Sequence, residues 1–524
     1  MATTSPNSLQ DCLSTSLPDG FHCKIRHVKT PVKRCEALYS PAAGRKPEMT
    51  RGASHFLAVT ILAPANAVEK AAERGEVLVL GLEILTYYTK HLTTIFVSKA
   101  DSTGYLPPQR PSPARQIVST FISWIVAQEM KQRPLTKLVV SLFARSQSQY
   151  LFPGSAENKA KHILDDRQLI KWWTRVLDPL FPSDPPANDR PPRHQGYVTV
   201  PGYAGHELRH FFPPGPTSAA HWNPGHPLSE LATTRRIPPS AAPRCLLPLF
   251  PDDPKARFVQ DLDDEVGIST DSVPTSSPAK CRNGAWTTIR DLDQFWEAME
   301  FRQECSSGRS VGFIWVVICP ADSEVSAAKD AAHETVADGS PAPPQSKKPT
   351  SSAPRTTRVH GAKKLTGPIV PRPPRIKGVS CSLTAPDAST VDSTSGKHMP
   401  PESILLSREG YDRCMQALLH LDFAHVQVAT QSTAKWVRET SILANIHGAW
   451  GTEVCGTLVV GDKAASGQPA GRVNDLGGMV RKKRKVEDGS SGNLQGSETV
   501  EKGATASVNL LSGGLVRKKA KEPS

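Results

Sequence analysis

The aromatic residues of this 524-residue chain are confined to two stretches, and their distribution limits which parts can fold. No Phe, Trp or Tyr occurs between Trp315 and Tyr411, and none follows Trp450. Ordering a chain costs conformational entropy that buried apolar surface must offset. We therefore expect a core at 1–320, a disordered insertion at 321–404, a helical segment at 405–445 that completes the core, and a disordered basic tail at 446–524.

Composition narrows the class of protein. With 47 prolines and 38% hydrophobic residues, we expect one large core beside segments that do not pack. The formal net charge of +13 favours anionic partners without choosing among them. The ten cysteines include no Cys-x-x-Cys pair, so a reducing compartment fits best. No apolar run reaches the ~18 residues of a membrane span, and no signal-peptide pattern opens the chain, so we expect a soluble intracellular protein.

Hydrophobic periodicity predicts a mixed sheet flanked by helices, which is an α/β fold. Residues 1–50 show no strong period, and 182–243 are rich in proline, histidine and glycine, so that we expect at best an ordered loop there. The predicted strands are 56–62, 77–87, 93–97, 135–143 and 311–318, the second and third forming a hairpin around Lys90. The predicted helices are 113–126, 169–180, 258–266, 289–305 and two short ones after Ser407.

Residues 246–258 contain several prolines, which fix the backbone, together with several charged residues. An apolar run ends in Asp252 and Asp253, which stand between Pro251 and Pro254. Because each proline fixes φ near −65°, the two carboxylates project from a stiff corner, where neighbouring groups would shift their pKa values. One interpretation is a general base. The other, which the residues alone favour, is a helix start with Asp253 as N-cap and Pro254 in the first turn.

Two further motifs suggest enzyme classes that their surroundings disfavour. His206-Glu-Leu-Arg-His210 matches the His-Glu-x-x-His pattern of zinc metalloproteases. Neighbouring glycines and prolines leave barely two helical turns and no downstream ligand motif follows, so we expect no metal. Cys245 could be the nucleophile of a covalent acyl intermediate. No adjacent histidine would activate it, so we expect a small buried side chain.

Trp172 and Trp173 are adjacent in a predicted helix, beyond Tyr150. Such aromatic residues more often belong to a core than to a site. Neighbours on a helix point in different directions, so at least one indole must leave the buried stripe. That indole could wall a tunnel for a lysine side chain or cover the pantetheine arm of a cofactor.

Five blocks in the same order resemble the fungal histone H3 lysine acetyltransferases of the regulator-of-Ty-transposition type. The resemblance covers about 1–320 and 405–445. It implies a mixed α/β fold similar to the CBP-type acetyltransferases. The blocks are Ile95-Phe-Val-Ser-Lys-Ala-Asp101, Ser148-Gln-Tyr-Leu-Phe-Pro153, Lys161-His-Ile-Leu164, Lys171-Trp-Trp173 and Pro248-Leu-Phe-Pro-Asp-Asp-Pro-Lys-Ala-Arg257.

The resemblance implies acetyl-CoA as the co-substrate. Coenzyme A carries a pyrophosphate and a ribose phosphate, to which Arg110, Arg115 and Lys161 could make charge-assisted bonds. The implied cofactor-binding residues are Ala100, Asp101, Ser102, Arg110, Arg115, Phe143, Gln147, Lys161, His162, Ile163, Leu164 and Trp172.

The resemblance also implies direct attack of a lysine on the thioester, with no metal. Lysine has a pKa of about 10.4 and must lose a proton before it attacks, which a carboxylate and a desolvated tunnel would both promote. Lys255 matches a lysine that becomes autoacetylated, and this modification would remove a cation beside two carboxylates. The implied catalytic residues are Asp253 as acid/base, Asp252 beside it, and Trp173, Asp101 and Tyr150 along the tunnel.

The implied substrate is histone H3 within H3–H4, modified at a lysine of its αN helix and at tail lysines. Chaperones of the NAP family and of the anti-silencing-function type would present it, during nucleosome assembly and in resistance to DNA damage. The alternative is a catalytically inactive chromatin- or histone-binding scaffold. The intact Asp-Asp-Pro-Lys and Trp-Trp blocks argue against that alternative.

The tail repeats one basic pattern. Gly477-Gly-Met-Val-Arg-Lys-Lys-Arg-Lys485 is followed by Gly513-Gly-Leu-Val-Arg-Lys-Lys-Ala-Lys521. Such runs are commonly solvated charge, but they also suit an importin groove or a phosphate backbone. Together with the resemblance, they favour importin as a partner and the nucleus as the location.

Overall fold

The computed structural model describes residues 8–42, 45–64, 75–182, 192–215, 220–266, 286–302, 309–320, 403–446 and 450–459. All of them belong to one compact unit, Met1–Val460. Nearly all of the expected insertion and most of the expected tail lie outside the described residues. Within the described ranges, every helix is too short or too polar to cross a membrane.

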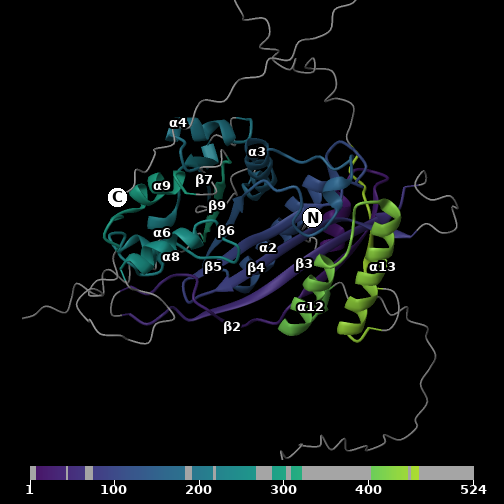
Figure 1. The fold of residues 1–524 in the computed structure, drawn as a ribbon, viewed down its shortest axis with the longest axis horizontal. Coiled ribbons are helices and arrows are strands. Elements are labelled where there is room, and N and C mark those ends of the chain that lie inside the picture. The colour runs from purple at the N-terminus through teal and green to yellow at the C-terminus, as the bar shows by residue number, and fades with distance from the viewer. Residues whose placement is uncertain are drawn as a thin grey trace, which may run out of the picture. The chain divides into compact units, whose positions relative to one another are not determined.

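One mixed sheet of eleven strands organises this unit (Figure 1). Its strands are β1 (His22–Lys29), β2 (Lys33–Cys35), β3 (Thr50–Leu62), β4 (Glu76–Tyr88), β5 (Leu92–Ser102), β6 (Lys137–Ala144), β7 (Arg193–Thr199), β8 (Trp222–Pro224), β9 (Gly312–Cys319), β10 (Ser403–Leu405) and β11 (Thr452–Cys455). Their order is β10-β1-β3-β4-β5-β6-β9-β7-β8, with β11 also paired to β1 and β2 to β3. The pairs β1–β10, β5–β6 and β7–β8 are parallel and the others antiparallel, which confirms the predicted mixed sheet.

Helices cover both faces of the sheet. The helices are α1 (Leu9–Ser16), α2 (Pro113–Gln132), α3 (Asp166–Leu177), α4 (Gly205–Leu208), α6 (Leu228–Thr234), α7 (Pro243–Leu246), α8 (Ala256–Glu265), α9 (Leu292–Glu300), α12 (Arg408–Leu419) and α13 (Val426–Leu443), with the 3₁₀ turns η3 (Ser155–Glu157), η4 (Asp178–Leu180) and η5 (Arg209–Phe211).

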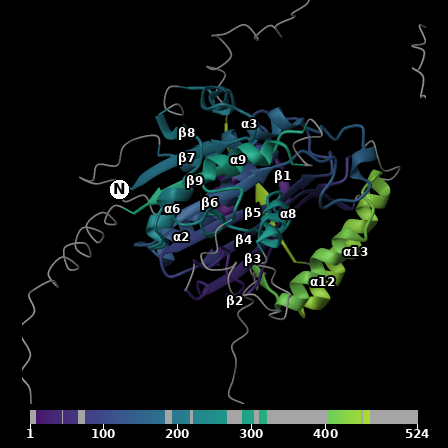
Figure 2. The same cartoon turned by 60° about the vertical axis from the view of Figure 1, so that its left-hand side comes forward.

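Strand alternation assigns each helix to a face. Ile314 and Val316 of β9 pack in the cluster of α1, α2 and α3, whereas Phe313 and Trp315 pack with α6, α8 and α9. The second face also carries α12 and α13, because Tyr411 of α12 contacts Glu83, whose partner Lys99 reaches the turn before α8. α13 packs against α12 and β4, and the two helices lie apart from α6, α8 and α9 (Figures 1 and 2). The second face therefore holds two separate groups of helices.

The predicted elements with strong periodicity are confirmed. β4 and β5 form the antiparallel hairpin, and β3 pairs with β4. α2 starts after the N-cap Ser112 with Pro113 in its first turn, and Ser407 caps α12 by accepting the N–H of Gly410. The segment that follows, α13, has 18 residues and is longer than the predicted short helix.

Two stretches without apparent periodicity contain helices and strands among their described residues, whereas at best an ordered loop was expected for 182–243. Residues 182–243 contain β7, β8 and α6, and β7 pairs with β9 along its whole length. Within 1–50, β1 is a central strand that carries charged side chains inward. Arg26 is only 4% exposed because its guanidinium pairs with Glu76, 2.7 Å away, and donates to the hydroxyl of Thr60. Such paired charges hide the apolar pattern on which sequence prediction depends.

The predicted boundaries around the insertion and tail are also corrected. β10 starts at Ser403 and pairs with β1, while β11 lies in the expected tail and pairs with the same strand. Trp450 is buried, and its Nε1–H donates to the carbonyl of Val437. The folded unit therefore continues to at least residue 459.

The buried His27 of β1 and the half-buried His55 of β3 face each other. His27 Nε2 lies 3.2 Å from His55 Nδ1, and His27 Nδ1 lies 2.8 Å from the hydroxyl of Ser403. Burial, and then the neighbouring His55 and Lys29, hold the pKa of His27 well below its usual value. Burial, assisted by Lys29, lowers the pKa of His55 to about 4. Both imidazoles are therefore neutral in the folded protein at neutral pH.

We predict that this pair makes the fold sensitive to acid. As pH falls from 6.5 to about 4 the unfolded histidine binds a proton that folded His55 refuses, so the free energy of unfolding decreases across this window. His55→Gln should reduce this decrease by about 1.4 kcal/mol per pH unit, measured by urea denaturation between pH 7 and 5. His206→Gln, at an exposed position, is the control and should keep the wild-type slope. A wild-type slope in His55→Gln would contradict the prediction.

Candidate functional site

A cavity of about 390 Å³ opens where β5 and β6 separate. These parallel strands pair from Leu92 and Lys137 only as far as Phe96 and Ser141, although β5 continues to Ser102. Every residue from Val97 to Ser102 lines the cavity. Because β4 occupies the other edge of β5, the N–H and C=O groups on this edge have no strand partner among the described residues. A bound molecule can supply those hydrogen bonds.

The start of α2 lies at the same cavity, which Ser112 and Ala114 help to line. The first turn contains no acidic residue, and the side chain of Ser112 makes no capping hydrogen bond. First-turn N–H groups lack intrahelical acceptors and carry the positive end of the helix dipole. This end of the cavity therefore favours an anion such as a phosphate.

Trp172 and Trp173 of α3 both line the cavity. Trp173 is buried and Trp172 half-buried, with ring centroids 4.9 Å apart and planes at 81°. As expected from their adjacency, the two rings differ in orientation. With the branched aliphatic residues of the lining they form an apolar wall, which comprises Leu80, Val97, Leu106, Val118, Leu142, Ile163, Leu164 and Leu169.

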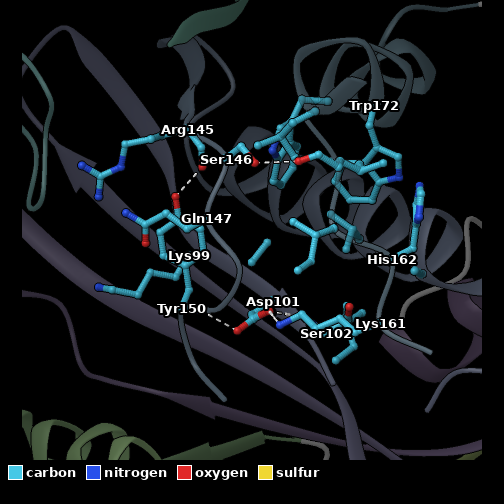
Figure 3. Close-up of a pocket in the computed structure, with 18 of the residues that line it drawn as sticks. Lys99, Asp101, Ser102, Arg145, Ser146, Gln147, Tyr150, Lys161, His162 and Trp172 are labelled. Atoms are coloured by element: carbon cyan, nitrogen blue, oxygen red, sulfur yellow. Dashed lines mark hydrogen bonds and ion pairs between the residues drawn. The ribbon is translucent and has the colours of Figure 1, made fainter. Parts of the chain in front are cut away.

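A buried ion pair joins Asp101 and Lys161 in the cavity wall (Figure 3). Lys161 Nζ lies 2.8 Å from Asp101 Oδ1 and 2.8 Å from Ser155 Oγ. Asp101 Oδ2 accepts the backbone N–H groups of Tyr150 and Leu151, at 2.7 and 2.9 Å. Since both carboxylate oxygens are engaged, the geometry gives Asp101 a positioning role, and the ammonium of Lys161 is committed to this pair.

The loop that follows β6 is closed around the cavity by its own hydrogen bonds. The hydroxyl of Tyr150 donates to the carbonyl of Arg145, and Ser146 Oγ donates to the carbonyl of Leu164. In Figure 3, Lys99, Arg145 and Tyr150 lie on the opposite side of the cavity from His162 and Trp172. The loop thus separates a side with basic and phenolic groups from a side with aromatic rings.

Asp253 and Lys255 form a second buried ion pair, which does not line the cavity. Their side chains are 0% and 3% exposed. The Asp253 carboxylate also accepts the N–H groups of Phe250 and Lys255, and Lys255 Nζ donates to the carbonyl of Pro248, 2.8 Å away. The predicted N-cap role of Asp253 is wrong, because α8 begins at Ala256 after the N-cap Lys255. Its acid/base role stays a prediction.

Asp252 differs from Asp253 in backbone conformation, in exposure and in the lysine that it contacts. Its backbone is left-handed, with φ of 56°, its side chain is 64% exposed, and its carboxylate lies 3.1 Å from Lys99 Nζ. Lys99 lines the cavity. The exposed carboxylate of the pair, rather than the buried one, is therefore in contact with the cavity rim.

The structure brings together most of the residues expected for the site. Arg110 is exposed, and Arg115 lines a separate recess with Arg175 and Pro213. Neither they nor Asp252, Asp253 and Lys255 line the cavity. The expected residues that do line it are Ala100, Asp101, Ser102, Phe143, Gln147, Tyr150, Lys161, His162, Ile163, Leu164, Trp172 and Trp173.

Five polar residues of the lining were not among the expected site residues: Ser98, Lys99, Ser112, Arg145 and Ser146. Lys99, Arg145 and Ser146 stand in or next to the blocks that carry the family resemblance. Lys99 could have been found as the one charged side chain between the apolar run 95–97 and Asp101. Arg145 and Ser146 follow a strand directly and have no comparable signal.

The two alternative motifs do not form sites in the described part of the chain. α4 ends at Leu208, within the His-Glu-x-x-His stretch, and His206 and His210 are exposed. No cluster of three or more His, Cys, Asp or Glu residues suited to a metal ion occurs in the described ranges. Cys245 is buried as expected, and burial raises the pKa of its thiol.

Comparison with known proteins gives matches along almost the whole chain. The sequence model of the histone acetyltransferase KAT11-type domain matches residues 9–134 and 125–439. Histone acetyltransferase rtt109 of Aspergillus flavus is 36% identical over 575 aligned positions, which cover 98% of this chain and 99% of that protein. Its counterpart in Schizosaccharomyces pombe is 27% identical over 314 positions, 58% of this chain and 70% of that protein.

A solved structure shares the fold. The crystal structure of Rtt109 from Aspergillus fumigatus matches with a TM-score of 0.62 and 35% sequence identity, covering 86% of this chain and 100% of that one. The matched residues 9–439 of the sequence model include every segment that lines the cavity.

Gly104 permits the close approach of two walls of the cavity, which gives a prediction. Its φ is +87°, and a Cβ there would lie 2.7 Å from backbone atoms of Lys161. Gly104→Ala adds this clash to the cost of a left-handed residue, about 1–2 kcal/mol, so we expect a further loss of about 1–3 kcal/mol in the free energy of unfolding. In the control Gly20→Ala, φ is +74° and nothing lies within 4 Å. Equal losses in urea denaturation would contradict the close approach.

Proposed function

Because the chain belongs to the family of histone acetyltransferases with a KAT11-type domain, we propose that it transfers the acetyl group of acetyl-CoA to lysine side chains of histone H3. The supporting observation is the cavity between the separated ends of β5 and β6, with an open strand edge, a helix N-terminus and two tryptophans around it. A lysine of the H3 αN helix is the proposed main target, with tail lysines as further targets.

The lining suits acetyl-CoA chemically. Its pantetheine arm carries two amides, which can pair with the open backbone edge of β5 beyond Val97. The N–H of Ser102 is not available for this, because it donates to Asp101 Oδ1. The aliphatic part of the arm fits against Trp172 and the apolar wall. The pyrophosphate fits the start of α2. Since Lys161 is engaged by Asp101, the proposed phosphate ligands are the first-turn amides with Arg110 and Arg115.

The residues around the cavity can prepare the substrate lysine for attack. Bound acetyl-CoA supplies a thioester carbon that a neutral amine attacks directly. Apolar walls such as Trp173 disfavour an ammonium and so lower the pKa of an entering lysine. Asp101 accepts the backbone N–H of Tyr150, which supports the proposed position of the phenol beside the path of that lysine. Asp252 at the rim attracts the incoming cation.

Acetylation of Lys255 would change the second ion pair. An acetylated lysine keeps an N–H donor but loses its positive charge. Asp253 would then be a buried carboxylate without a paired cation. We propose that Asp253 acts as acid/base in this acetylated state, in which its carboxylate no longer holds the ammonium of Lys255.

The proposed activity is tested with labelled acetyl-CoA and an H3–H4 complex, with and without a NAP-family chaperone, followed by mass spectrometry of the histones. We expect labelling of the αN-helix lysine that the chaperone increases. Absence of labelling under every condition would support the alternative, a scaffold that binds histones without modifying them.

We predict that Asp253→Asn lowers turnover by a factor of at least ~100, the range for losing an acid/base group, while acetyl-CoA still binds with unchanged affinity in titration calorimetry. Lys255→Arg is a second test, because it keeps the cation but cannot be acetylated. It should retain the fold and, like Asp253→Asn, lose turnover. Thermal unfolding of both variants must also be measured, since breaking a buried ion pair lowers the free energy of unfolding by about 3–5 kcal/mol. Full turnover by Asp253→Asn would remove Asp253 from the mechanism.

We also propose a nuclear location, with chaperones of the NAP and anti-silencing-function types delivering H3–H4 and importin binding the two basic runs of the tail. The runs lie outside the described residues. Deletion of 481–485 and 517–521 should leave activity on purified histones unchanged and reduce nuclear accumulation, seen by fluorescence microscopy. Deletion of the uncharged stretch 489–495 is the control. Full nuclear accumulation without both runs would show that import depends on another element.

A further inference from the structure

A chain of polar contacts runs across one face of the sheet from α12 to the rim of the cavity. The hydroxyl of Tyr411 donates to Glu83 Oε1 at 3.1 Å. Glu83 Oε2 accepts from Ser98 Oγ at 2.9 Å and from Lys99 Nζ at 3.3 Å. Lys99 Nζ in turn lies 3.1 Å from Asp252 Oδ2. The chain thus joins α12, β4, β5 and the loop between α7 and α8.

An irregularity in the β4–β5 ladder positions Ser98 and Lys99, which form the middle of this series of contacts. Glu83 pairs with Lys99, but Ile84 pairs with Val97, so Ser98 is an extra residue in β5. Such a bulge turns side chains away from strict alternation, and here both Ser98 and Lys99 reach the same carboxylate. Both residues also line the cavity.

The series of contacts from Tyr411 to Asp252 lies between the two groups of helices on the second face. Tyr411 belongs to α12, and Asp252 to the turn before α8. Glu83 and Lys99 come from the strands between them and receive one contact from each side. A shift of α12 would therefore act on Glu83, and through Lys99 on Asp252.

Charge and burial make the central contacts hard to lose. The Glu83 side chain is 9% exposed and that of Lys99 is 27% exposed, so their mutual attraction is screened less than at an open surface. Burial lowers the pKa of Lys99, but Glu83 and Asp252 outweigh it and raise that pKa overall. Burial and then Glu83 raise the pKa of Tyr411 well above its usual value. Lys99 therefore stays a cation and Tyr411 stays a donor.

Asp252 is the exposed end of the chain. Its left-handed backbone is unfavourable for a residue with a Cβ, and its carboxylate is largely in solvent. Two carboxylates share the single cation of Lys99, so one negative charge remains unbalanced in this group. Because Glu83 is buried, that charge is presented to solvent by Asp252, beside the opening at Lys99 and Tyr150.

We propose that Lys99 is a positioning residue for the histone substrate, holding Asp252 at the cavity rim where it meets the basic side chains that flank the target lysine. Tyr411 fixes Glu83 and so ties the rim to α12, the helix that follows residues 321–402 in sequence. This inference rests on the proposed acetyl transfer. It assigns Lys99 no contact with the reacting atoms.

The kinetic test compares Lys99→Met, Lys99→Arg, Asp252→Asn and the double variant Lys99→Met/Asp252→Asn. Lys99→Met should raise KM for H3–H4 and lower kcat/KM about tenfold, with KM for acetyl-CoA unchanged, while Lys99→Arg retains most activity. The double variant should be no worse than Asp252→Asn alone, because Lys99 acts through Asp252. Tyr411→Phe should lower kcat/KM about twofold. Lys435→Met, which removes an exposed lysine of α13, should have no effect.

Losses that multiply in the double variant, or a raised KM for acetyl-CoA, would overturn the positioning role. A second measurement does not depend on turnover: mass spectrometry of the rate at which an isotopic amine-acylating reagent modifies Lys99. The rate should increase severalfold in Asp252→Asn and in Glu83→Gln, because each frees the amine. Unchanged rates would overturn the bridge itself. An inactive wild-type protein with a protected Lys99 would instead refute the proposed acetyl transfer.

Discussion

The cavity exists because β5 and β6 stop pairing after Phe96 and Ser141. Parallel strands normally continue their ladder as long as both remain extended, and an open edge leaves backbone groups without partners. Here the carboxylate of Asp101, near the end of β5, takes up amides of the loop beyond β6 and holds that loop away from the strand. The Asp101 side chain thus keeps the gap open by accepting hydrogen bonds from backbone N–H groups that would otherwise need another partner.

Two buried acid–base pairs serve this architecture in different ways. Asp101 and Lys161 join separate segments around the cavity. The side-chain hydrogen bonds of Asp253 and Lys255, in contrast, join residues within 248–255 and fix a single turn. Burying such charges gains little net stability, because desolvation offsets the attraction. Their value lies in geometry, since a displaced partner would leave an uncompensated charge. The exposed Asp252 is less constrained, because solvent surrounds most of its side chain and Lys99 holds its carboxylate from one side.

Local patterns allowed prediction of the elements whose apolar residues have a clear period. The hairpin β4–β5, helix α2 and strand β9 were predictable for this reason. β1 was not, because Arg26 and His27 are buried through partners that are distant in sequence. Likewise, four of the five family blocks contribute residues to the cavity lining, 12 of the 26 in total. The fifth block holds Asp253, whose loss of solvent contact depends on the path of Lys255 toward Pro248. Contacts of this kind depend on three-dimensional proximity, which spacing does not encode.

The pairing of β1 has a consequence for how the chain folds during synthesis. One edge of β1 pairs with β3, and the strands that pair with its other edge in the described ranges are β10 and β11. The hydrogen bond from Arg26 to Trp450 spans 424 residues. At synthesis rates of about 5–20 residues per second, that edge stays open for tens of seconds on the ribosome. The nascent protein therefore exposes one edge of β1 until the segment of β11 emerges, which makes it a candidate client for general folding chaperones throughout translation.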